Sequence, residues 1–245
     1  MKLFVLSLFP EESRQFFLKG IFKRGYDAGI FDITFLNLRD FSDDKHRKVD
    51  DYPYGDKHGM LLKADIIYKA VTSIPDYQNM RVIFPCPKGP VLDQSYSTDC
   101  LSAEGIIIIA GYYEGVDDRL FQLLSIETVS VGNVVLSSGE SPSLMLAESI
   151  IRLIPGVVGK QSSVEDDSIL SGLLKYPQYT EPRAINGLEV PEVVTSGHHM
   201  KKARWQRYES LKKTLFNKPD MVMKYELTSD DQNMIADILK ENRND

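Results

Sequence analysis

Two strand-like apolar runs, each ending in a turn of glycines and carboxylates, place the strongest constraint on how this chain can fold. The run 106–110 leads into Gly-Tyr-Tyr-Glu-Gly, and the run 127–136 leads into Ser-Ser-Gly-Glu-Ser-Pro. Strands that deliver glycine turns to one sheet edge build ligand sites in α/β proteins, because glycine lets backbone amides approach a ligand closely. The chain has neither GxGxxG nor GxxxxGK followed by Ser or Thr. The pattern therefore predicts a ligand site that is not built around phosphates.

Strands and helices alternate over residues 1–155, which indicates an α/β fold with a mostly parallel sheet covered by helices. We expect further strands at 2–8, 31–38 and 81–84, and helices at 10–25, 61–72 and 144–153. Ser141 as N-cap and Pro142 at the first helical position predict the start of the last of these helices. The polar segment 46–59 is expected to be a loop.

The rest of the chain predicts a second, smaller domain. Residues 160–171 are polar and acidic and are expected to form a linker. Residues 172–245 predict a small helical domain, in which Ser196-Gly197 precedes a basic helix and Thr228 caps a final helix. The expected domains are therefore 1–159 and 172–245.

Composition and charge narrow the function classes. The chain has 245 residues, no apolar run of membrane-spanning length and no evident signal peptide, which predicts a cytoplasmic protein without membrane contact. Its two cysteines form no CxxC pair, and no metal-ligand spacing occurs, so we predict reduced thiols and no metal. The segment 198–218 carries a local charge of +6 in a chain of net charge −6. It is either a surface for a polyanion or a solvated helix face.

An ordered series of motifs along the whole chain resembles the bacterial tRNA (guanine-N1)-methyltransferase family of the SPOUT class. The motifs are LFP, HRKVDDYPYG, AGYYEGVDDR, VGNVVLSSGE, RLIPGVVG, LKYPQYTEP and GLEVPEVVTSGHH. The resemblance implies a SPOUT-type sheet with a deep trefoil knot that binds S-adenosylmethionine. It also implies a homodimer with the active site at the subunit interface, and methylation of guanine N1 at position 37 of tRNA, next to the anticodon. A knot would not be expected from the sequence pattern, because threaded chains are very rare.

The resemblance also implies which residues bind the cofactor. They are Cys86, Pro87, Gly89, Gly111, Tyr113, Glu114, Gly115, Val131, Gly132, Asn133, Val134, Val135, Leu136, Gly139 and Pro142. Apolar strand ends and glycines suit an uncharged adenine fixed by backbone amides. An ordinary buried strand is the alternative for 131–136.

By the same resemblance Asp167 is the general base and Arg152 its electrophilic partner. A carboxylate near N1 can accept the proton that must leave, while a guanidinium stabilises the charge that develops on O6. The alternative for Arg152 is a surface ion pair with Glu148. The alternative for Asp167 is a solvated acidic linker, and Glu165 or Asp166 would be the base if the register differs.

The resemblance assigns tRNA contacts to two regions. They comprise His46, Arg47, His199, Lys201, Lys202, Arg204 and Arg207, whereas Trp205 is expected in the core of the small domain. Departures from the family pattern occur at Asp56-Lys57-His58, Cys86, Tyr112, Asn133 and Ser138. A ribose 2′-O-methyltransferase and a non-catalytic RNA-binding module remain the alternative functions.

Overall fold

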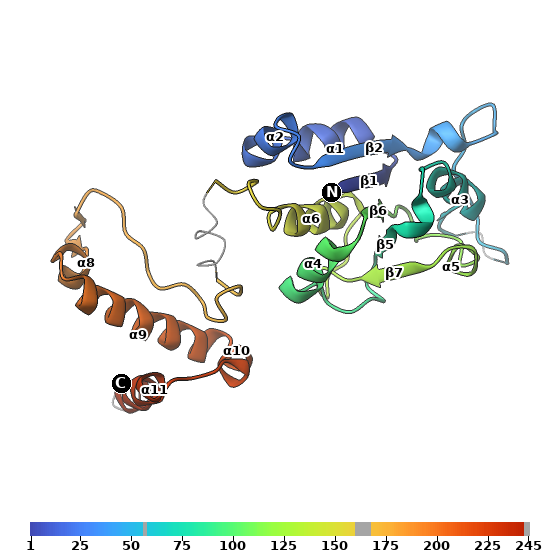
Figure 1. The fold of residues 1–245 in the computed structure, drawn as a ribbon. Helices are drawn as coiled ribbons and strands as arrows, with labels where there is room; N and C mark the ends of the chain where they lie inside the picture. Colours follow the sequence, from blue (N-terminus) through green and yellow to red (C-terminus); the bar gives the residue numbers. More distant parts are fainter. Residues whose placement is uncertain (56–57, 160–167, 243–245) are drawn as a thin grey trace. The chain divides into compact units, whose positions relative to one another are not determined.

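The computed structural model describes residues 1–55, 58–159 and 168–242 (Figure 1). The chain separates into two compact units, with the division between Gln161 and Ser162. Much of the predicted linker lies outside the described residues, so the domain bounds given above stay a prediction. Each unit is described by itself.

A five-stranded sheet forms the centre of the N-terminal unit. Its strands are β1 (Lys2–Ser7), β2 (Asp32–Asn37), β5 (Arg81–Pro85), β6 (Gly105–Ile109) and β7 (Ile126–Val129), and their order is β2-β1-β6-β5-β7 (Figure 1). Every pair of neighbours is parallel. The prediction of an α/β fold with a mostly parallel sheet is confirmed.

Helices cover both faces of this sheet. The helices of one face are α1 (Pro10–Phe17), α2 (Gly20–Asp27), α4 (Gln94–Asp99) and α6 (Glu140–Ile151), and those of the other are α3 (Ala64–Thr72) and α5 (Leu120–Leu123). Strand β6 shows the division, because Ile106 and Ile108 pack in the cluster that contains α6, and Ile107 and Ile109 in the cluster that contains α3. All four isoleucines are fully buried. A parallel strand covered on both faces is accordingly apolar at every position.

Short elements complete the N-terminal unit. They are the antiparallel pair β3 (Asp50–Asp51) and β4 (Leu61–Leu62), and the 3-10 helices η1 (Leu38–Phe41), η2 (Tyr77–Asn79) and η3 (Cys100–Ser102). The expected loop 46–59 thus contains one short strand. The helix expected at 61–72 starts only at Ala64, and α4 was not predicted.

Three sequence-based expectations about element bounds are wrong. The helix expected at 10–25 is two helices, because Lys19, which lies between them, is extended, with a φ of −131° and a ψ of 158°. Helix α6 begins at Glu140 with Gly139 as its N-cap, not at Ser141 and Pro142. The strand expected at 127–136 ends at Val129.

Strand β7 ends early because its only neighbour ends. Pro85, the last residue of β5, pairs with Val129, and β7 has no partner on its other side within the sheet. Ser130 still pairs with Val91, donating its amide to the Pro90 carbonyl and accepting from the Leu92 amide, and the ladder among the described residues stops there. Gly132, with a φ of +137°, turns the chain away, and Val135 is 97% exposed. Residues 131–136 are therefore an exposed loop, neither an extension of β7 nor the ordinary buried strand considered as an alternative.

The C-terminal unit is mainly helical. It contains α8 (Glu192–Thr195), α9 (His199–Asn217), α10 (Pro219–Lys224) and α11 (Ser229–Glu241), with a hairpin of β8 (Ala184–Ile185) and β9 (Leu188–Glu189). Leu173, Leu211, Met234 and Ile238 form its core. The predicted cap is confirmed, since Thr228 and Asp231 form a reciprocal capping box at the start of α11. Trp205 is only half-buried, with its ring 6.4 Å from that of Tyr179.

Candidate functional site

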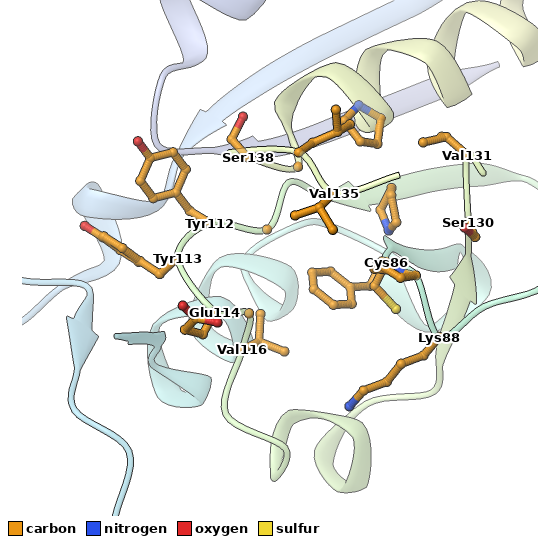
Figure 2. A pocket seen from close by; sticks show the side chains of 18 of the residues that line it. Cys86, Lys88, Tyr112, Tyr113, Glu114, Val116, Ser130, Val131, Val135 and Ser138 are labelled. Atoms are coloured by element: carbon orange, nitrogen blue, oxygen red, sulfur yellow. The ribbon is translucent and has the colours of Figure 1, made fainter. Parts of the chain in front are cut away.

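A pocket of about 360 Å³ lies beyond the carboxyl ends of β5, β6 and β7 (Figure 2). Three loops line it, namely 84–88, 111–118 with Phe121, and 130–142. Parallel sheets typically bind ligands at this edge, where several strand ends converge. The volume falls within the range of small-molecule sites.

Most of the predicted cofactor residues line this one pocket. They are Cys86, Pro87, Gly111, Tyr113, Glu114, Gly115, Val131, Gly132, Val134, Val135, Leu136, Gly139 and Pro142. Gly89 and Asn133 lie outside the lining. Gly89 instead packs on β7, because a Cβ there would lie 2.5 Å from the carbonyl carbon of Thr128. The structure thus brings together segments that are more than 40 residues apart in the chain.

Other side chains of the lining were not predicted. They are Phe84, Pro85, Lys88, Tyr112, Val116, Asp118, Phe121, Ser130 and Ser138. A sequence signal existed for two of them, because Phe84 and Pro85 directly precede the predicted turn at Cys86. Lys88 lies in the segment 86–89, of which only the backbone was expected at the cofactor. Asp118 had no signal, since an exposed charged residue in a turn is ordinary.

Two glycines allow the loops of the pocket to touch backbone to backbone. The Gly139 amide donates a hydrogen bond of 2.6 Å to the Gly111 carbonyl oxygen. A Cβ on Gly139 would lie 2.4 Å from the Gly111 nitrogen, and one on Gly111 would lie 2.8 Å from Cε2 of Phe84. Neither position has room for a side chain, so glycine is required here by close approach.

A carboxylate anchors the same corner of the pocket. Glu140, in the first turn of α6, accepts hydrogen bonds from Ser7 Oγ at 2.8 Å and from Ser13 Oγ at 2.6 Å. Both serines are buried. The partial positive charge of the helix N-terminus also favours an acidic side chain there. Glu140 therefore ties the end of β1, α1 and α6 together next to Gly139.

Aromatic residues form one rim of the pocket. Tyr112 lies 5.5 Å from Phe9 and 4.7 Å from Tyr113, measured between ring centroids. Tyr113 has a φ of +58°, an uncommon backbone state for a residue with a side chain. Burial, followed by the nearby Asp50, raises the pKa of the Tyr113 hydroxyl. Tyr113 consequently stays protonated at neutral pH.

Of the two predicted catalytic residues, the structure describes only Arg152, which does not line this pocket. Asp167 lies outside the described residues. Arg152 is half-buried and is the C-cap of α6, whereas Gly139, which lines the pocket, is the N-cap of the same helix. With a rise of about 1.5 Å per residue, the two ends lie roughly 20 Å apart. A single chain therefore places Arg152 far from the pocket.

The predicted tRNA-contacting residues occur in both units. His46 and Arg47 are exposed in the N-terminal unit, where Arg47 lies 3.2 Å from Asp40. On α9, His199, Lys201 and Arg204 are exposed and Lys202 is half-buried. None of these three cations of α9 has an ion pair with another described residue.

Arg207, in contrast, is engaged within the C-terminal unit. Its Nε and Nη2 donate to both carboxylate oxygens of Asp231, at 2.7 and 2.8 Å, and its Nη1 donates to the Tyr225 hydroxyl. Such a bidentate pair is geometrically specific. Arg207 thus fastens α9 to the start of α11, a role that its place in the basic helix did not predict.

Neither a metal-binding cluster nor a membrane-spanning helix occurs in the described ranges 1–55, 58–159 and 168–242. No group of three or more His, Cys, Asp or Glu side chains in them is arranged to hold a metal ion. No helix in them is long and apolar enough to cross a bilayer.

Comparisons with known proteins agree in pointing to one family. Residues 1–224 match the family model described as tRNA (Guanine-1)-methyltransferase TrmD. Proteins named tRNA (guanine-N(1)-)-methyltransferase from Staphylococcus carnosus and Dehalococcoides mccartyi are 40% and 42% identical to this chain, and in each case the similarity covers 98% of both chains. A protein of the same name from Dictyoglomus turgidum is 40% identical over 99% of this chain and 98% of its own. The chain therefore belongs to the tRNA (Guanine-1)-methyltransferase TrmD family.

Proposed function

We propose that this protein methylates N1 of guanine in tRNA, at position 37, with S-adenosylmethionine as the methyl donor. The observation that carries the proposal is the glycine-built pocket at the carboxyl edge of the sheet, in a chain of this family. The predicted cytoplasmic location belongs to the same proposal.

The residues of the pocket fit the proposed cofactor. Phe84, Val116, Phe121 and Leu136 offer apolar surface for an adenine ring, and the turns at Gly111 and Gly132 expose backbone groups to it. When bound, S-adenosylmethionine supplies an electrophilic methyl group on a sulfonium. The SPOUT-type trefoil knot is part of the proposal, and it is supported by the close contact of Gly139 with Gly111 and by the packing of the following helix, α6, on β1, β5 and β6.

Two side chains would accept the proton of the target base and stabilise the negative charge that develops on it. Asp167 accepts the N1 proton of guanine as the methyl group arrives, and Arg152 donates hydrogen bonds to O6, where negative charge develops. Adenine has no N1 proton to give, so the same arrangement selects guanine. These roles rest on the family motif, and Asp167 is not among the described residues.

The position of Arg152 supports a shared active site in a homodimer. Within one chain, Arg152 lies about 15 Å along α6 from Pro142, the pocket-lining residue of this helix that is nearest to it in sequence. A guanidinium must approach O6 within hydrogen-bond distance to act. A second copy that brings its own Arg152 and Asp167 to this pocket meets that requirement, and a single chain does not.

Lys201, Lys202 and Arg204 would bind tRNA phosphates, together with His46 and Arg47. The three cations of α9 have no ion-pair partner among the described residues, so they are available to a polyanion. Arg207 is left out of this surface because Asp231 already holds its guanidinium.

Mass spectrometry of a tRNA transcript incubated with the methyl donor tests the activity. We expect N1-methylguanine with the wild type and none with Asp167→Asn, because the amide cannot accept the proton. Glu165→Gln and Asp166→Asn are the matched controls, and both should retain activity. Loss of activity only in one of these controls would move the base to that residue.

The alternative functions give different results in the same assay. A methylated ribose would identify a 2′-O-methyltransferase, and binding without any product would identify an RNA-binding module. A wild-type protein that sediments as a fully active monomer would contradict the shared active site.

A filter-binding assay over a range of salt concentrations tests the α9 surface. Replacing Lys201, Lys202 and Arg204 with Gln should lower tRNA affinity and reduce the salt slope by about 2–3, since each lost phosphate contact removes somewhat less than one released counterion. The control replaces Arg183, Lys224 and Lys240 with Gln, which removes the same charge from exposed positions of this unit outside α9. Equal effects of the two triple variants would refute a specific α9 surface.

A further inference from the structure

The pocket contains three charged side chains, all from its loops. They are Lys88 from the loop after β5, and Glu114 and Asp118 from the segment after β6 (Figure 2 labels Lys88 and Glu114). Within the described parts of the chain, no ion pair or side-chain hydrogen bond engages any of their charged ends. The neighbouring Asp117, in contrast, is paired with Arg119. One cation and two carboxylates therefore remain available to a ligand.

These charges mirror those of the proposed cofactor. At neutral pH S-adenosylmethionine carries one carboxylate and two cations, the ammonium and the sulfonium. The remaining lining of the pocket is uncharged and largely apolar, including Phe84, Val116 and Phe121. A charge pair at a partly enclosed apolar site is less screened than one in bulk water. Complementary charges there favour one orientation of the ligand.

We propose that Lys88 binds the carboxylate of the methyl donor's amino-acid part, while Glu114 and Asp118 face its two cations. This inference rests on the proposed function. Lys88 is the only cation among the described residues that line the pocket, so it is the group available for a carboxylate. The apolar surface proposed for the adenine ring would not by itself distinguish S-adenosylmethionine from a nucleoside that lacks the amino-acid part. Lys88 thus makes the site specific for a nucleoside that carries an amino acid.

Calorimetric titration with two ligands tests the assignment without relying on turnover. The ligands are S-adenosylmethionine and 5′-methylthioadenosine, which keeps the nucleoside and sulfur but lacks the amino-acid part. Lys88→Met should weaken binding of S-adenosylmethionine about 5- to 30-fold, the range of a partly solvated charge-assisted contact. Its affinity for 5′-methylthioadenosine should stay within about twofold of the wild type.

Two variants serve as controls. Lys88→Arg keeps the positive charge and should restore most of the affinity for S-adenosylmethionine. Lys2→Met removes an exposed lysine from the amino end of β1, the opposite edge of the sheet, and should leave both affinities unchanged. Unchanged melting temperatures exclude a general loss of structure.

The possible outcomes distinguish failure of the Lys88 assignment from failure of the proposed function. Unchanged affinity of Lys88→Met for S-adenosylmethionine, or equal weakening for both ligands, would overturn the role of Lys88 while leaving the cofactor assignment intact. A wild type that binds neither ligand would overturn the proposed function itself, and the role of Lys88 with it.

Discussion

Gly139→Ala is the substitution that most directly tests how the pocket is built. Gly139 has a φ of −81° and a ψ of 1°, which alanine can adopt, so backbone strain does not enter. The added Cβ would lie 2.4 Å from the nitrogen and 2.9 Å from the oxygen of Gly111. Relieving this overlap needs a movement of about 1 Å between the two loops, since non-bonded heavy atoms prefer about 3.5 Å or more.

The cost of that movement follows from two terms. Overpacking at a tight site costs about 1–3 kcal/mol, and loss of the hydrogen bond between Gly139 and Gly111 costs about 0.5–1.5 kcal/mol. We therefore expect the free energy of unfolding to fall by about 2–4 kcal/mol, which lowers Tm by roughly 5–15 °C for a unit of this size. Affinity for the methyl donor should fall too, because Gly139 lines the pocket.

Urea unfolding followed by circular dichroism, together with calorimetric titration, measures both effects. Gly159→Ala is the matched control, because a Cβ at Gly159 meets no atom of the described residues within 4 Å. It should change the free energy of unfolding by less than about 0.5 kcal/mol. If Gly139→Ala kept the stability and donor affinity of the control, the close contact between the two loops would be wrong.

Two further predictions concern ionisable groups. The hydrogen bonds from Arg207 lower the pKa of Asp231, so this carboxylate stabilises the folded state at neutral pH and the contribution fades as pH falls below the ordinary value near 3.8. Asp231→Asn should thus lower the free energy of unfolding by about 2–3 kcal/mol at pH 7, measured by fluorescence of the single tryptophan, Trp205. The difference from wild type should shrink below pH 4. A difference that stays constant with pH would argue against the ion pair. Burial raises the pKa of the Cys100 thiol to about 11, so iodoacetamide should label Cys86 first. Because Cys86 lines the pocket, S-adenosylmethionine should slow that labelling. Faster labelling of Cys100, or no protection by the donor, would contradict this placement.

Features that depend on near neighbours in the chain were predictable. The apolar runs at 2–8 and 106–110 predicted two strands that the structure contains, shifted by a residue at their ends. Thr228 with an acidic residue three positions later predicted the cap of α11. Glycine turns after the strands predicted where the pocket would lie. In each case the determining interaction, a hydrogen bond or an apolar periodicity, lies within a few residues of sequence.

Features that depend on a distant partner were not predictable. The run 127–136 has strand-forming residues, yet β7 stops at Val129, where its pairing with β5 ends, and after it only Ser130 pairs further, with Val91. The sequence places Arg207 in a basic segment, but its ion pair with Asp231 forms only because α9 packs on α11. Only the fold shows which residues of α6 line the pocket, and therefore that Arg152 lies about 15 Å along the helix from Pro142.

The amino-acid sequence alone therefore determined the parallel α/β architecture, the edge of the sheet that carries the pocket and the family to which the chain belongs. Those properties follow from local periodicity and from ordered motifs. Tertiary structure alone decided which side chains face the pocket, among them Lys88 and Asp118, and which cations stay available at the surface. Those properties depend on contacts between segments that are far apart in the chain, and no local sequence pattern predicts such contacts.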